Sequence, residues 1–81
     1  MKKNLLITGA AGGIGSEIAS YASRQGYRVG LIDLDNEKLK ETESRIENSI
    51  SLPTDITKEE SVAKALDLFG EIPDALVNCA G

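Results

Sequence analysis

A cluster of glycines near the start of the chain is the feature most able to do chemistry. Four glycines, at positions 9, 12, 13 and 15, follow a short apolar run and open a stretch with helical periodicity. In that context a glycine pattern predicts phosphate binding, because bare backbone N–H groups and the positive end of a helix attract an anion. Gly9 suits the tight exit from a strand, Gly13 a close approach to a pyrophosphate, and Gly15 close packing of the helix on the sheet.

Neither a simple tight turn nor a Walker-type phosphate loop accounts for the four glycines. A tight turn alone does not need so many, since each one costs backbone entropy. A Walker-type loop needs a lysine before the Ser or Thr at the start of the helix. Here Ser16 follows Gly15 directly, so that loop is excluded. The pattern therefore predicts a dinucleotide bound through its pyrophosphate.

An acidic residue ends the second apolar run of the chain. In a βαβ dinucleotide unit, an acid at the place of Asp33 accepts hydrogen bonds from the adenosine ribose hydroxyls. The carboxylate would repel a 2′-phosphate, and neither Gly12 nor Leu34 offers a basic side chain to bind one. We therefore expect NAD rather than NADP. Alternatively, Asp33 could cap the next helix, but Asp35 or Asn36 can do so and leave it free.

The elements that must position these residues alternate along the chain. Short apolar runs predict strands over residues 5–8, 29–32, 49–52 and 75–78, and helical spacing predicts helices over 13–25, 36–47 and 58–69. Runs without strict alternation of polar residues suit parallel strands buried on both faces. The expected fold is α/β, a doubly wound parallel sheet with strand order 3-2-1-4 and right-handed crossovers. The more polar run at 49–52 belongs nearer a sheet edge.

Local signals refine the third helix. Thr57 and Glu60 have the spacing of a capping box, with Thr57 as the N-cap. Val62, Leu66 and Phe69 would form the buried stripe of this helix.

Composition excludes several classes of function. The chain has 81 residues, of which 41% are hydrophobic and 27% charged, as in ordinary soluble globular domains. It has no histidine, so no His-ligated metal site and no Ser-His-Asp or Cys-His catalysis can form in it. The net charge of −4 and the dispersed Lys and Arg argue against nucleic-acid binding. No run is long enough for a membrane span or signal peptide, so we expect a cytoplasmic setting. Without histidine we also expect no metal site.

Three segments resemble motifs of the short-chain dehydrogenase/reductase family. Residues 8–15 match its Thr-Gly-x-x-x-Gly-x-Gly coenzyme motif, residues 52–57 are similar to its Asp-Val-Thr segment, and 77–81 to its Asn-Asn-Ala-Gly motif. Cys79 replaces the second Asn of that last motif. The resemblance implies that Asp55 meets the adenine amino group and that the backbone of Ile56 lies near the ring. With the glycine loop, the candidate cofactor-binding residues are Gly9, Ala11, Gly12, Gly13, Ile14, Gly15, Asp33, Leu34, Asp55, Ile56, Asn78, Ala80 and Gly81.

The resemblance also implies the activity, an NAD-dependent oxidation or reduction of an alcohol or carbonyl substrate. Family members catalyse with a Tyr-x-x-x-Lys pair, but Tyr21 and Tyr27 are followed four residues later by Gln25 and Leu31. We therefore expect no catalytic residue here, and both tyrosines to pack against the sheet. Residues 1–81 would be the N-terminal part of one dinucleotide-binding domain, cut after its fourth strand. They would be inactive alone, and the complete protein a homo-oligomer.

Two other functions remain open. The chain could be a stand-alone, non-catalytic nucleotide-binding module. The spacing of Gly9, Gly12 and Gly15 also suits the extended branch of the family, with epimerases and dehydratases of nucleotide sugars. The segment 78–81 argues against that branch.

Overall fold

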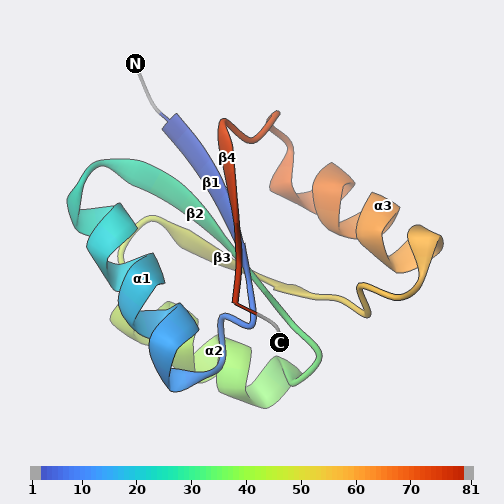
Figure 1. Cartoon of the computed structure of the whole chain (residues 1–81), viewed down its shortest axis with the longest axis horizontal. Coiled ribbons are helices and arrows are strands. Elements are labelled where there is room, and N and C mark those ends of the chain that lie inside the picture. The colour runs from blue at the N-terminus through green and yellow to red at the C-terminus, as the bar shows by residue number, and fades with distance from the viewer. Residues whose placement is uncertain (1–2, 80–81) are drawn as a thin grey trace.

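Strands and helices alternate along the whole of the described chain. The computed structural model describes residues 3–79. Its elements are β1 (Lys3–Thr8), α1 (Gly13–Arg24), β2 (Tyr27–Asp33), α2 (Asn36–Arg45), β3 (Ser49–Pro53), α3 (Glu59–Phe69) and β4 (Ala75–Asn78). All neighbouring strands pair in parallel, in the order β3-β2-β1-β4 (Figure 1). The predicted fold class and strand order are confirmed, with the more polar β3 at an edge.

Helices cover both faces of the sheet. α1 and α2 lie on one face and α3 on the other (Figure 1). Each face has its own buried cluster, centred on Ile7, Val29 and Leu31 under α1 and α2, and on Leu6 and Phe69 under α3. Because β1 and β2 are buried on both faces, successive residues along them must be apolar. This is the physical reason for the unbroken apolar runs in the sequence.

Glycines and one aspartate mark the helix ends. Gly26 and Gly70 have positive φ angles of 95° and 77°, which end α1 and α3 in a conformation that glycine adopts without strain. Asp35 is the N-cap of α2, and its carboxylate accepts the Lys38 N–H at 3.1 Å. Asp33 is therefore not needed as a helix cap.

The capping box predicted for α3 is wrong. The helix begins at Glu59 with Lys58 as N-cap, and within residues 3–79 no side chain caps it. Thr57 instead donates its N–H and hydroxyl to the Asp55 carboxylate, at 3.0 and 2.5 Å. The helix begins one residue later than the capping box requires, so Thr57 lies before the N-cap position and its side chain bonds to Asp55.

Two expected packing contacts also differ from the structure. Tyr21 is 59% exposed on α1, whereas Tyr27 is half-buried against the core. Leu66 is 43% exposed, and Ala65 takes its place beside Phe69 in the buried stripe of α3.

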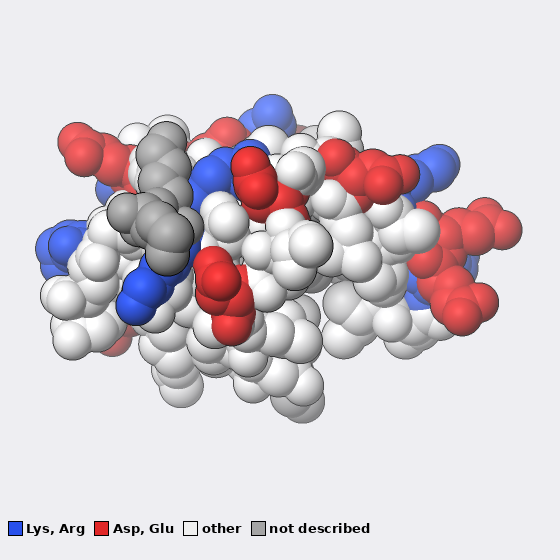
Figure 2. All heavy atoms as spheres, turned by 90° about the horizontal axis from the view of Figure 1, so that it is seen from above, with Lys and Arg blue, Asp and Glu red and all other residues white. Residues whose placement is uncertain are grey.

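The surface shows mixed charge. Figure 2 views the molecule from the side on which β1 begins, and shows acidic and basic side chains interspersed with an uncharged area below them. Among residues 3–79, no helix is long and apolar enough to cross a membrane.

Candidate functional site

The candidate residues gather at the carboxyl edge of the sheet. β1 lies between β2 and β4, and the connecting helices change face there: α1 follows β1 on one face, and α3 precedes β4 on the other (Figure 1). In open α/β sheets, the crevice outside the carboxyl ends of strands at such a switch point is where ligands bind. The loop after β1 opens directly into this crevice.

The loop after β1 is a compact turn that leads into α1. Gly9 has a φ of 69°, and its carbonyl accepts the Gly12 N–H at 3.1 Å. Gly12 is the N-cap of α1, and no side chain of residues 3–79 caps that helix end. No acidic residue lies in its first turn. This end of α1 therefore presents free N–H donors and a positive dipole to an anion.

The surroundings of Gly13 and Gly15 show that glycine stands at these two positions for different physical reasons. A Cβ on Gly15 would lie 2.2 Å from the Gly9 carbonyl oxygen, so the fold itself requires glycine there. A Cβ on Gly13 would meet nothing within 4 Å. The protein's own packing thus gives no reason for glycine at position 13. Ile14 beside it is 75% exposed in the first turn of α1.

Asp33 ends β2 with both carboxylate oxygens bonded to backbone. Its Oδ2 accepts the Ala11 N–H at 3.0 Å, and its Oδ1 accepts the Leu34 N–H at 2.7 Å. The carboxylate is half-buried between the glycine loop and the end of β3, where the Thr54 N–H donates to the Asp33 carbonyl at 2.8 Å. Three chain segments therefore meet at this residue.

A cavity of about 270 Å³ lies beside Asp33. Its volume is just below the range of about 300–1,000 Å³ typical of sites for whole small ligands, so it suits one part of a larger ligand. Its walls combine apolar side chains, which suit a flat ring, with a few polar groups. They are Thr8, Gly9, Ile32, Asp33, Leu34, Thr54, Asp55, Ile56 and Thr57.

Asp55 lies at the rim of this cavity and is fixed there by hydrogen bonds to Thr57 and Ser61. The hydroxyl and then the N–H of Thr57 hold the pKa of the Asp55 carboxyl below its ordinary value of 3.8, and the Lys58 charge adds a little. Both Thr57 donors bond to Oδ1. The Asp55 N–H donates to the Ser61 hydroxyl at 2.9 Å, which fixes the backbone of the rim to α3.

The end of β4 completes the described part of the site. The Thr8 hydroxyl donates to the Asn78 Oδ1 at 2.7 Å, and the Cys79 N–H donates to the Thr8 carbonyl at 3.2 Å. Asn78 thus braces β1 where the glycine loop begins. Ala80 and Gly81 lie outside the described residues.

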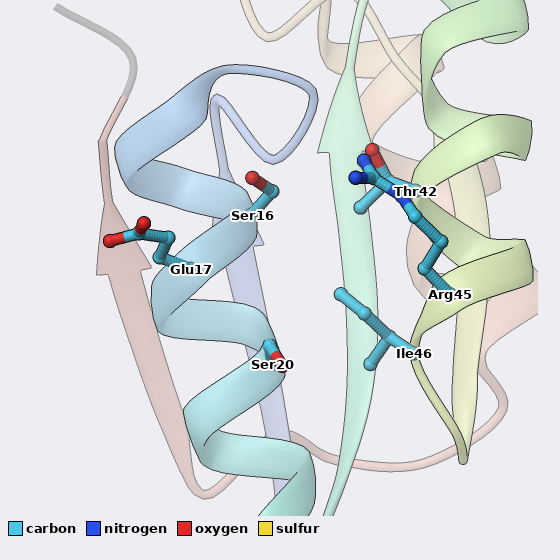
Figure 3. Close-up of a pocket in the computed structure, with 6 residues that line it drawn as sticks. All are labelled: Ser16, Glu17, Ser20, Thr42, Arg45 and Ile46. Atoms are coloured by element: carbon cyan, nitrogen blue, oxygen red, sulfur yellow. The ribbon is translucent and has the colours of Figure 1, made fainter.

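A second hollow lies between α1 and α2 (Figure 3). Its hydroxyls already have partners within their own helices: Ser16 donates to the Gly13 carbonyl, Thr42 to the Lys38 carbonyl, and Ser20 accepts from Arg24. Figure 3 shows Glu17 pointing away from α2. Because these groups do not converge, the hollow is a groove between packed helices.

Three residues of the site were not selected from the sequence. Thr54 is buried beside the cavity and its hydroxyl donates to the Leu52 carbonyl, while Thr57 and Ser61 hold Asp55. The hydroxyl groups of Thr54 and Ser61 have no distinctive spacing in the sequence. Only Thr57, two residues after Asp55, has the spacing of a local Asx turn that could have been recognised.

The residues present fit a dinucleotide. A helix end with free donors, an open approach at Gly13, a carboxylate at the end of β2 and a ring-sized cavity follow one another along one edge. Among residues 3–79, no three His, Cys, Asp or Glu side chains are grouped to hold a metal ion.

Comparison with known proteins identifies relatives over the whole chain. The family model for short chain dehydrogenase matches residues 3–81. The uncharacterized oxidoreductase YxjF of Bacillus subtilis is 39% identical over 99% of this chain and 34% of its own. A diacetyl reductase ((S)-acetoin forming) of Staphylococcus epidermidis is 36% identical over 100% of this chain and 34% of its own. This chain spans about a third of the length of these relatives.

Solved structures agree. A 3-oxoacyl-(acyl-carrier protein) reductase with bound NAD from Brucella melitensis superposes with a TM-score of 0.90 at 31% identity. The match covers 98% of this chain and 32% of that one. A hydroxysteroid dehydrogenase from Escherichia coli gives a TM-score of 0.89, also at 31% identity, over 98% of this chain and 37% of that one.

Proposed function

The chain belongs to the short-chain dehydrogenase/reductase family, and from this premise we propose that it binds NAD for hydride transfer. The observation that carries the proposal is the glycine at position 13, which the protein's own packing does not require. A ligand that approaches the backbone there explains it, and the free donors of α1 favour an anion such as a pyrophosphate.

We assign the remaining roles along the edge of the sheet. Gly12, Gly13 and Ile14 bind the pyrophosphate, and Asp33 accepts the adenosine ribose hydroxyls. Leu34 and Ile56 enclose the adenine ring, and the free oxygen of Asp55 accepts its amino group. Gly9 and Gly15 shape the loop and Ala11 lies within it, while Asn78, Ala80 and Gly81 line the ribose. The negative charge of Asp33 favours NAD over NADP.

We propose the activity for the complete protein. Bound NAD would accept a hydride from an alcohol substrate or, as NADH, donate one to a carbonyl. The residues of this chain bind and orient the cofactor, and the chemistry on the substrate belongs to a part of the protein outside residues 1–81. In this proposal residues 1–81 are the N-terminal part of one dinucleotide-binding domain, inactive alone, and the complete protein is a cytoplasmic homo-oligomer.

The alternative functions are not favoured. The four relatives compared with this chain are oxidoreductases, reductases or dehydrogenases by name, and none of them is named an epimerase or a dehydratase.

The proposal is tested by titrating NAD into the complete protein by calorimetry. We expect wild type to bind NAD, and Gly13→Val to lose at least about tenfold in affinity, because the new side chain occupies the approach to the helix end. Ser20→Val, two turns further along α1, places the same side chain away from the loop and should bind NAD as wild type does.

Three results would contradict the proposal. They are no NAD binding by wild type, unchanged affinity in a folded Gly13→Val variant, and preference for NADP over NAD. Thermal unfolding of each variant shows that it is folded before its affinity is compared.

A further inference from the structure

Both oxygens of the Asp33 carboxylate accept backbone hydrogen bonds before any ligand binds. Its two oxygens accept the N–H groups of Ala11 and Leu34. Ala11 lies in the glycine loop, 22 residues earlier in the chain. A carboxylate oxygen has two lone pairs, so each can still accept a ribose hydroxyl while it holds the backbone.

The loop is tied to β2 at two successive residues. The Ala10 N–H donates to the Ile32 carbonyl at 3.1 Å, a backbone bond that any side chain allows. The Ala11 N–H donates to the Asp33 side chain, so this second tie depends on the carboxylate alone. It is the tie nearer to Gly12, where α1 begins.

The position of this tie matters because the loop is rich in glycine. Gly9, Gly12 and Gly13 give the backbone more freedom than other residues would, and that freedom must be lost when the N–H donors converge on a phosphate. A half-buried hydrogen bond to a charged acceptor is among the stronger ones in proteins. Holding Ala11 therefore orders the loop in advance.

We propose that Asp33 is a positioning residue for the phosphate-binding loop, acting through the Ala11 N–H, in addition to contacting the ribose. This inference rests on the proposed function, because it concerns the same site. It implies that one carboxylate supports the binding of both the ribose and the phosphate parts of the cofactor.

The proposal predicts that removing the Asp33 carboxylate lowers the affinity for a diphosphate, whereas charge repulsion alone predicts the opposite. If Asp33 only contacted the ribose, removing its negative charge would leave the affinity for a diphosphate lacking ribose hydroxyls unchanged or raised. If Asp33 also holds the loop, removing it lowers that affinity. The probe that separates the two is 2′,3′-dideoxy-ADP, which keeps the adenine and the diphosphate.

The first measurement needs no ligand. Amide hydrogen exchange in the ligand-free complete protein should show the Ala11 N–H protected, and in Asp33→Ala its exchange should quicken by about tenfold or more. Asp33→Asn keeps an oxygen that can accept this N–H and should restore part of the protection. The matched control Asp35→Ala removes a neighbouring carboxylate and should expose the Lys38 N–H, leaving Ala11 protected.

The second measurement is the affinity for 2′,3′-dideoxy-ADP. We expect Asp33→Ala to weaken it by about tenfold, with Asp33→Asn intermediate and Asp35→Ala unchanged. Unchanged Ala11 exchange in Asp33→Ala, or an unchanged or higher affinity for this probe, overturns the proposal even if NAD still binds. Failure of wild type to bind ADP or NAD would instead overturn the proposed function, while the exchange of Ala11 would still report the tie.

Discussion

At the scale of single residues, two glycines in the first turn of α1 differ in what surrounds them. The space around Gly15 is filled by the backbone of Gly9, which cannot rotate away as a side chain could. The space around Gly13 is open. One glycine therefore serves the fold, and the other is free to serve a ligand.

This difference predicts different effects on stability. Gly15→Ala should lower the free energy of unfolding by about 1–3 kcal/mol, because its Cβ meets the Gly9 carbonyl. Gly13→Ala, the same change two residues earlier, should leave it unchanged or slightly raised. Denaturant unfolding of the complete protein measures both. Equal losses in the two variants would contradict the assignment.

The Asp55 carboxyl provides a prediction on pH. Thr57→Val removes the hydroxyl donor and keeps the N–H, so the pKa of Asp55 should rise toward 3.8, and Lys58→Ala should raise it less. Because the folded pKa is lowered, the carboxylate stabilises the native state above pH 3.8, and this contribution is lost as the pH falls through the lowered pKa. NMR titration of the side-chain carbon tests this. An unaltered pKa in Thr57→Val would show that the hydroxyl has no such effect.

At the scale of elements, β2 contains a glycine that its strand position does not explain. A Cβ on Gly30 would lie 2.4 Å from Leu6 Cδ2, 2.9 Å from Leu52 Cδ1 and 3.1 Å from Phe69 Cδ1. Because Gly30 has no side chain, it leaves a space that side chains of β1, β3 and α3 fill. Arg28 reinforces the same contact, since its guanidinium lies 4.4 Å from the centre of the Phe69 ring and donates to the Phe69 carbonyl at 2.6 Å.

We therefore expect Gly30→Ala to destabilise the sheet-to-α3 interface. The expected loss is about 1–3 kcal/mol of unfolding free energy, because close-packed side chains must move. Shortening the nearest of them should relieve the clash, so Gly30→Ala combined with Leu6→Ala should lose less than the sum of the two single variants. Strict additivity in denaturant unfolding would show that Leu6 is not the group displaced.

At the scale of the whole molecule, the described sheet has one apolar edge. β4 pairs only with β1 among the described strands, and Leu76 on it is 65% exposed. Exposed Leu66 and Ile56 lie on the same side, around the cavity between α3 and β4. Apolar edge strands readily pair with other chains.

The isolated 81-residue chain should therefore self-associate. We expect its sedimentation to depend on concentration, and Leu76→Lys to shift it toward monomer, because a charge at the edge opposes strand pairing. The control combines Leu76→Lys with Lys64→Leu, which adds apolar surface on the exposed face of α3 rather than on β4. This double variant should stay monomeric, because the added apolar surface does not lie on the edge strand. A sharp, reversible, monomeric melt of the unmodified chain would contradict this prediction.

Local patterns along the chain were enough to predict the order of elements, the parallel strand order and the place of the glycine loop. The signals are apolar runs, helical spacing, and glycines between a strand and a helix, and each of them can be read within a short segment. The same patterns placed Asp33 at the end of a strand, because an acid that closes an apolar run marks where the strand leaves the core. The resemblance of residues 52–57 to a family motif placed Asp55 after the third strand.

Contacts between distant segments became known only from the folded chain. The bond from Ala11 to Asp33 joins residues 22 positions apart, and the hollow at Gly30 is filled from three other elements. The physical reason is that hydrogen bonds and close packing depend on distances between segments, which no spacing along a single chain specifies.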